Sequence, residues 1–155
     1  MTSSNVTHDT FVIVRDFDSP VQSVFRAWSD PESKARWFAG SSGARGTTYE
    51  LDFQVEGREV NRGGPPGGPT YTYSARFRDI VIDQRIVYTY EMLADDTRIS
   101  VTVATIEFHG SAGGTRLMLT EQGVFLDGRD NASQREEGTH GWLDALAASL
   151  AEDET

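Results

Sequence analysis

The sequence predicts an α+β fold, in which a curved antiparallel sheet of about seven strands surrounds one long C-terminal helix. Three observations support this prediction. Residues 131–152 are the only long stretch with helical periodicity. Residues 49–122 mostly alternate apolar and polar side chains, as strands with one buried face do. The two helical segments after the first strand are too short to cover a sheet, so the C-terminal helix must cover it.

The C-terminal helix is amphipathic, but its buried stripe is uneven. At about 100° per residue, the bulky members of the stripe fall in its C-terminal half. They are Trp142, Leu143, Leu146 and Leu150. The N-terminal half of the stripe offers Arg135, Gly138 and Thr139, which cannot fill a core. We therefore expect this helix to fill one end of the sheet and to leave a small-molecule cavity at the other.

The start of the chain predicts a strand that is followed by two short helices. Residues 10–17 are rich in β-branched side chains and predict a strand. Ser19 can cap the helix that follows, and Pro20 suits its first turn. Asp30 and Pro31 repeat this signal for a second short helix that ends near residue 38. We interpret Trp28 and Trp37 as core or rim anchors of the pair.

A loop over residues 40–46 leads into the strands of the sheet. Tyr49 to Val55 alternate, and Glu56-Gly57 predicts a two-residue hairpin turn into residues 58–62. Residues 63–69 (GGPPGGP) cannot be regular structure. The remaining strands are predicted near residues 71–77, 86–92, 98–109 and 115–122. Short turns join most of these strands, so we expect them to be antiparallel. We expect residues 1–155 to form one domain, with a flexible start over residues 1–9.

Composition excludes several classes of function. The chain has 14 basic and 24 acidic residues and a net charge of −10, which disfavours binding to nucleic acid or to an anionic membrane surface. It has no cysteine, so disulfides, thiolate metal sites and a cysteine nucleophile are excluded. No signal peptide or apolar membrane span is present in the sequence. We expect a cytoplasmic protein.

All five tyrosines fall on the apolar phase of their predicted strands: Tyr49, Tyr71, Tyr73, Tyr88 and Tyr90. Burying a hydroxyl group without a partner costs about 1–3 kcal/mol, so a dry core would use phenylalanine or leucine instead. The hydroxyls therefore either reach solvent at the rim of the sheet or line a partly polar cavity, and the sequence leaves both interpretations open. Phe53 and Phe77 share this inward phase.

Glu121 continues the inward phase of Leu117 and Leu119. A carboxylate on a buried face needs a charged or hydrogen-bonding partner, or its pKa rises. The candidate partners are Arg58 and Arg62, placed on the inward phase with Val60, and Arg135 on the helix. The alternative, which the sequence favours, is that the strand has left the sheet at Glu121 and that the carboxylate is solvated.

No motif for catalysis, a metal or a cofactor is recognisable. Glu107 and His109 lie two apart on one strand face, but two ligands without a third do not make a metal site, and a solvated pair is the simpler interpretation. The prolines of residues 63–69 remove backbone donors that a phosphate loop would need. We expect no metal and no cofactor, and the sequence identifies no catalytic residue.

Four segments together resemble a known family. They are RDFDSPVQSVFRAWSDPESKARWF (15–38), ARFRDIVIDQRIVYTYEM (75–92), GTRLMLTEQG (114–123) and GWLDALAASL (141–150). In the same order, they resemble blocks of the activator of heat-shock-protein-90 ATPase homologue-like proteins, a branch of the START-like (SRPBCC) superfamily. The resemblance implies a helix-grip fold of START/Bet v type with a hydrophobic cavity between sheet and helix.

The favoured function is a protein that binds a small apolar or aromatic molecule in this cavity. The first alternative is a cyclase, dehydratase or hydrolase that uses the cavity for acid–base chemistry. The second is a chaperone-associated interaction protein, which is not favoured because the ATPase activators of the family carry a separate domain for that contact. A homodimer is compatible with each of these three functions. The candidate lining of the cavity is Tyr49, Phe53, Tyr71, Tyr73, Phe77, Tyr88, Tyr90, Glu121, Arg135, Thr139 and Trp142.

Overall fold

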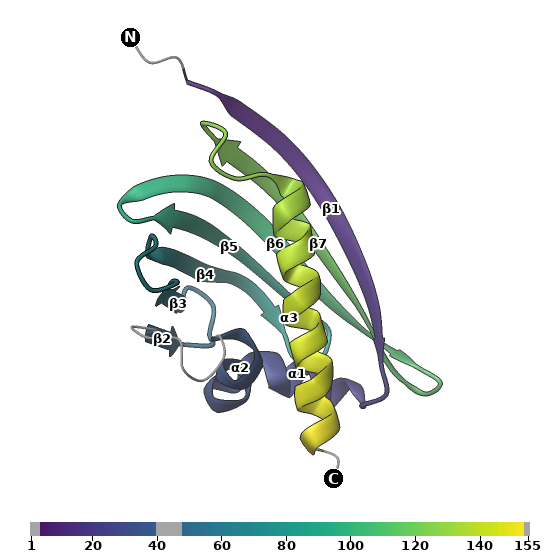
Figure 1. Ribbon diagram of the computed structural model, residues 1–155. Coiled ribbons are helices and arrows are strands. Elements are labelled where there is room, and N and C mark those ends of the chain that lie inside the picture. The colour runs from purple at the N-terminus through teal and green to yellow at the C-terminus, as the bar shows by residue number, and fades with distance from the viewer. Residues whose placement is uncertain (1–3, 40–47, 154–155) are drawn as a thin grey trace.

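The computed structural model describes residues 4–39 and 48–153, so the loop predicted at 40–46 lies outside the described residues. These residues form seven strands and three helices, whose arrangement Figure 1 shows. The elements in order are β1 (Val6–Phe17), α1 (Val21–Ser29), α2 (Pro31–Phe38), β2 (Thr48–Leu51), β3 (Arg58–Gly63), β4 (Tyr71–Val81), β5 (Arg85–Ala94), β6 (Thr97–Ser111), β7 (Gly114–Leu126) and α3 (Ala132–Asp153).

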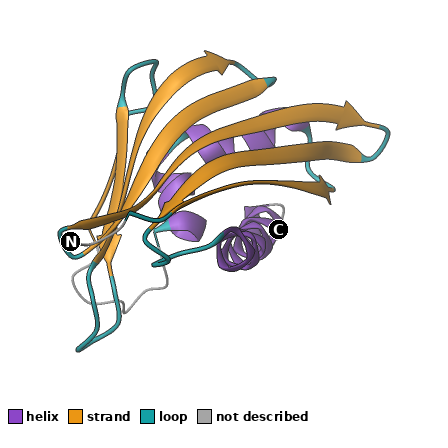
Figure 2. Ribbon diagram, turned by 90° about the horizontal axis from the view of Figure 1, so that it is seen from above, coloured by secondary structure: helices purple, strands orange, loops and turns teal. Residues whose placement is uncertain are grey.

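The seven strands form one antiparallel sheet in the order β1-β7-β6-β5-β4-β3-β2. The sheet is strongly curved, and α3 runs across its concave side, with α1 and α2 packed at one end (Figures 1 and 2). Successive strands are neighbours apart from β1, which pairs with β7 along its full length. This is the predicted architecture: a curved antiparallel sheet around a C-terminal helix, with two short helices after the first strand.

The first strand is longer than its sequence predicted. It begins at Val6, and residues 6–9 pair with Leu126 to Gly123 of β7 although they were expected to belong to a flexible start. Their side chains are exposed, which is why apolar patterning could not reveal this part of the strand.

The two short helices begin as predicted, but only one uses the predicted cap. Asp30 caps α2: its carboxylate accepts a hydrogen bond from the backbone N–H of Ser33 at 3.0 Å. Pro20, and not Ser19, is the N-cap residue of α1, and it provides no side-chain cap. Trp28 and Trp37 are both buried and pack edge-to-face at 4.8 Å between ring centroids, as expected for anchors of the pair.

The connection between β2 and β3 differs from the predicted two-residue hairpin. It spans residues 52–57, so Phe53 lies in a loop and Val55 is 51% exposed. Gly57 is required there, because a Cβ atom at this position would lie 2.2 Å from the carbonyl oxygen of Asp52. The longer loop shifts the phase of β3 by one residue, and Glu59 rather than Arg58 faces inward.

The C-terminal half of α3 is anchored by leucines. Leu143, Leu146 and Leu150 are buried against the sheet and the helix pair, whereas only Arg135 and Thr139 are buried in the N-terminal half. Gly138 does not share this buried face: it is exposed, and a Cβ atom there would meet nothing within 4 Å. The predicted contrast between the two halves of the buried stripe is therefore confirmed, but Gly138 is not part of that stripe.

We predict that Leu146→Ala lowers the free energy of unfolding by about 2–5 kcal/mol, because it deletes a fully buried side chain and leaves a cavity. Urea denaturation measures this change. Val12→Ala, at a residue that is 51% exposed, is the control and should cost less than about 1 kcal/mol. Similar losses in the two variants would contradict the leucine anchor.

Candidate functional site

A small space lies between the concave face of the sheet, the helix pair and the middle of α3. Its volume is about 20 Å³, which is enough for about one water molecule and much less than a ring compound needs. The wall is mostly aromatic. It is formed by Trp28, Trp37, Phe38, Tyr73, Tyr88, Tyr90, Leu119, Glu121, Thr139, Trp142 and Leu143.

The predicted lining residues separate into three groups. Six of them form the wall of this space: Tyr73, Tyr88, Tyr90, Glu121, Thr139 and Trp142. Tyr49, Phe53, Phe77 and Arg135 contact the same core one layer further out. Tyr71 has the inward phase, but it lies at the start of β4 and is 40% exposed. The rim interpretation is therefore correct for Tyr71, while Tyr73, Tyr88 and Tyr90 are buried.

Glu121 is buried, so the favoured expectation of a solvated carboxylate was wrong. It lies within β7, which continues to Leu126, and only 5% of its surface is exposed. The hydroxyl of Tyr90 donates a short hydrogen bond to Oε1 of Glu121. Burial raises the pKa of Glu121, and the contacts with Tyr90 and Arg135 oppose that rise only in part.

Arg135 is the partner that organises this side of the site. Its guanidinium donates to the Tyr90 hydroxyl at 2.8 Å and to the Ser100 hydroxyl at 2.9 Å. It also forms an ion pair with Asp130, just before α3. Arg135 thus connects the N-terminal half of α3 to β5 and β6 through hydrogen bonds, and its guanidinium also lies over the rings of Tyr90 and Phe125, at 5.5 Å and 5.7 Å from their centroids. Of the arginines proposed as partners for Glu121, Arg58 and Arg62 are exposed on the other face of β3.

A second buried carboxylate, Glu59, was missed by the sequence reasoning. It is fully buried, and it accepts hydrogen bonds from the ammonium of Lys34 at 2.8 Å and from the hydroxyls of Tyr49 at 2.5 Å and Tyr73 at 3.1 Å. The phase error in β3 concealed it. The signal that could have found it is Lys34, the only lysine of the chain, on a helix that packs against the sheet.

The Lys34 ammonium sits among aromatic rings. Its Nζ atom lies 4.9 Å from the ring centroid of Trp28, 5.4 Å from that of Trp37 and 4.3 Å from that of Phe38, within the range of cation–π attraction. Desolvation lowers the pKa of Lys34, and the charge of Glu59 opposes that effect. The pair ties α2 to β3 immediately behind the aromatic wall.

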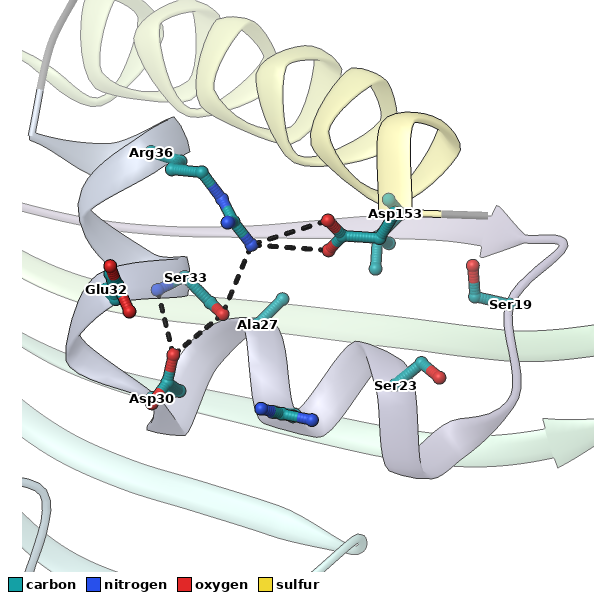
Figure 3. Close-up of a pocket in the computed structure, with 10 residues that line it drawn as sticks. Ser19, Ser23, Ala27, Asp30, Glu32, Ser33, Arg36 and Asp153 are labelled. Atoms are coloured by element: carbon teal, nitrogen blue, oxygen red, sulfur yellow. Dashed lines mark hydrogen bonds and ion pairs between the residues drawn. The ribbon is translucent and has the colours of Figure 1, made fainter. Parts of the chain in front are cut away.

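A larger groove lies on the surface where α1, α2 and the end of α3 meet. Figure 3 shows it: Arg36 reaches from α2 to Asp153 of α3, and Asp30 holds Ser33. Its volume is about 450 Å³. The groove is open and has few buried side chains. Because its charges are largely solvated or paired with one another, it is the weaker candidate for a specific site.

A metal centre has no support in the described ranges, where no group of three or more potential ligands occurs. On β6, Nε2 of His109 lies 3.7 Å from Oε1 of Glu107, and both side chains reach solvent, which agrees with the solvated pair expected from the sequence. None of the helices in the described ranges has the length and hydrophobicity that a membrane span requires.

A curved antiparallel sheet around a C-terminal helix, with two short helices after its first strand, defines a START-like fold. The family model for "Activator of Hsp90 ATPase homolog 1-like protein" matches residues 18–151, and the chain belongs to this family. No protein of curated function matches the chain.

Solved structures agree with this assignment. A protein of Rhizobium leguminosarum is 41% identical over 97% of this chain and 99% of its own, with a TM-score of 0.93. The Mll3558 protein of Rhizobium loti is 44% identical over 94% of this chain and 99% of its own, with a TM-score of 0.87. An AHSA1-like protein of Aeromonas hydrophila, 21% identical over 94% of each chain with a TM-score of 0.70, shares the fold.

We predict that Lys34→Met lowers the free energy of unfolding by about 3–5 kcal/mol, because it leaves Glu59 buried without a cation. The double variant Lys34→Met with Glu59→Leu should recover most of this loss. Arg36→Met is the matched control: the same helix carries an exposed ion pair with Asp153, worth about 1 kcal/mol or less. Equal losses for Lys34→Met and Arg36→Met would contradict the buried pair.

The free energy of unfolding is expected to depend on pH through Glu121. Since the folded-state pKa of Glu121 is raised above 4.5, the folded protein holds a proton there that the unfolded chain releases. The stability due to protonated Glu121 is complete below pH 4.5 and is lost as the pH rises through the folded-state pKa. The free energy of unfolding of the wild type, measured against Glu121→Gln, should therefore fall from pH 4.5 upward. Urea denaturation of both proteins at several pH values measures it, and parallel curves would contradict burial of the acid.

Proposed function

We propose that this protein binds a small apolar or aromatic molecule between α3 and the concave face of the sheet, and that it does so in the cytoplasm. The observation that carries the proposal is the aromatic wall beneath the middle of α3, where the helix presents the small polar side chain of Thr139 beside Trp142 and Leu143. A helix that served only to close a core would fill this position with leucine, as it does one and two turns later.

The enclosed space is too small for a ring compound, so binding requires α3 to open. The distribution of contacts along α3 favours its N-terminal half as the part that moves. Leu143, Leu146 and Leu150 fix the other half by apolar burial. Arg135 holds the moving half through hydrogen bonds, which are individually weaker and can be exchanged for water. The aromatic wall would then meet the ligand.

Native mass spectrometry of the protein purified from its own host tests the proposal directly. The expected result is a population of protein with the mass of one co-purifying small molecule, released on unfolding. A protein that carries no additional mass, and whose melting temperature no aromatic compound raises, would overturn the proposal.

We predict that Thr139→Ile reduces the fraction of protein that carries this molecule, by about tenfold in affinity, because the added carbon fills the space next to the wall. Thr139→Val is the matched control. It also loses the hydroxyl that donates to the Arg135 carbonyl, but it keeps the size of threonine. The same native mass measurement applies, and equal occupancy in the two variants would argue against a ligand beneath Thr139.

A second candidate is an enzyme that performs acid–base chemistry in the same space. Its support is the convergence of Glu121 and Tyr90 on the wall, with Arg135 behind them, since a buried acid with a raised pKa suits proton transfer. Incubation distinguishes the two functions: an enzyme changes the mass of the co-purifying molecule and loses this activity in Glu121→Gln, whereas a carrier returns the molecule unchanged.

A chaperone contact is a third candidate, supported by the family to which the chain belongs and by exposed apolar side chains on the outer face of the sheet. Val12 and Val14 of β1 and Val101 and Val103 of β6 are each at least 40% exposed. A pull-down from the host with the wild type and with a variant carrying serine at these four positions tests it. Recovery of the same chaperone by both proteins, or by neither, would remove this candidate.

A further inference from the structure

This inference deepens the proposed function and rests on it: it concerns which class of molecule the site beneath α3 accepts. Most polar groups of the wall already have a partner inside the protein. The Tyr73 hydroxyl donates to Glu59, the Thr139 hydroxyl to the carbonyl of Arg135 and the Trp37 indole N–H to the carbonyl of Ala27. Tyr90 both donates to Glu121 and accepts from Arg135. None of these groups needs a ligand.

Two further polar groups of the wall, one on Glu121 and one on Trp28, lack such a partner among the described residues. Oε1 of Glu121 is held by Tyr90, whereas Oε2 has no hydrogen-bond donor among the described residues. The indole N–H of Trp28 is enclosed and unpartnered within the same ranges, although Trp28 is only 4% exposed. An enclosed donor without an acceptor is unfavourable, because it has lost its hydrogen bond to water and gained none in return. Both side chains belong to the wall of the same space.

The geometry around Glu121 fixes which of its oxygens is free. Arg135 donates to the oxygen of Tyr90, so the Tyr90 hydroxyl hydrogen is directed to Oε1 of Glu121. Ser100 and Asp130 in turn hold Arg135 in place. The carboxyl group cannot rotate without breaking this chain of contacts. Oε2 is therefore a fixed hydrogen-bonding position and not a side chain that can turn away.

We propose that the ligand is an uncharged ring compound that carries a hydroxyl group, held by Oε2 of Glu121 and by the indole N–H of Trp28. A hydroxyl donates and accepts at once, so it satisfies Glu121 whether that carboxyl is ionised or protonated, and its oxygen can accept from Trp28. An ether or a ketone can only accept. A carboxylate would be placed against Glu121 in a region without solvent and is rejected. The aromatic wall receives the ring.

A series of four probes of similar size tests this class: naphthalene, 2-methoxynaphthalene, 2-naphthol and 2-naphthoate. Affinities are measured by NMR titration of the ¹⁵N-labelled protein, with the three tryptophan indole N–H signals as reporters. We expect 2-naphthol to bind at least about tenfold more tightly than naphthalene or 2-naphthoate, with 2-methoxynaphthalene between them. The indole signal that disappears in Trp28→Phe should move downfield with 2-naphthol and not with naphthalene.

Three variants test which side chains cause the preference for 2-naphthol. Glu121→Gln keeps the bond from Tyr90 to the amide oxygen and turns a donor NH₂ toward the space, so it should raise the affinity for 2-methoxynaphthalene relative to naphthalene. Trp28→Phe removes the indole donor and should lower the preference of the site for 2-naphthol over naphthalene several-fold. Trp142→Phe is the matched control: it trims a wall residue whose indole the proposal does not use, and it should weaken naphthalene and 2-naphthol alike.

The outcomes separate this inference from the function on which it rests. Equal binding of naphthalene and 2-naphthol to the wild type, or an unchanged preference in both Glu121→Gln and Trp28→Phe, would overturn the hydroxyl class and leave ligand binding intact. Binding of none of the four probes would overturn both. Naphthalene binding by each variant serves as the check that the variant is folded.

Discussion

Two carboxyl groups buried beneath the helices, Glu59 and Glu121, determine how the interior of this protein is organised. Each needs hydrogen-bonding partners, because an isolated buried carboxylate costs several kcal/mol. Glu59 is met by Lys34 of α2, and Glu121 is connected through Tyr90 to Arg135 of α3. Lys34 and Arg135 thus each connect a helix to the sheet next to the same aromatic wall, and Arg15 of β1 adds a contact with α3 through His140 and Asp144. Tyr49, Tyr73 and Tyr90 supply further hydrogen bonds to these carboxyl groups, which explains why these three residues are not phenylalanines.

This arrangement divides α3 into two parts with different modes of attachment. Three leucines fix its C-terminal half by apolar burial, which is lost only when the core is exposed. Its N-terminal half depends on Arg135 and on the small side chain of Thr139. Polar contacts of this kind can be replaced by water or by a ligand at low cost, so we assign opening to the N-terminal half of α3, which contributes Thr139 to the wall.

The architecture could be predicted from the sequence, because the spacing of apolar residues and the helix-start signals indicate it directly. Period-2 alternation located the strands, and the two proline signals located α1 and α2. The division of α3 was also predicted, since large and small side chains separate along its stripe. The inward orientation of Tyr73, Tyr88 and Tyr90 followed from the same phase argument.

The errors share one physical cause, which is that partners distant in sequence decide the local state. The loop of residues 52–57 shifted β3 by one residue and turned Glu59 inward in place of Arg58. Glu121 was assigned to solvent because the local pattern could not show that β7 continues between β1 and β6. The size of the space was overestimated for a similar reason: rings from the helix pair and from Trp142 enter it from outside the sheet.

Amide hydrogen exchange along α3 measures whether one half of this helix opens while the other half stays in place. We predict that amides of residues 133–141 exchange orders of magnitude faster than those of residues 143–151, and that a bound ring compound slows the first group selectively. Uniform exchange along α3, at the rate of global unfolding and unchanged by any ligand, would contradict it.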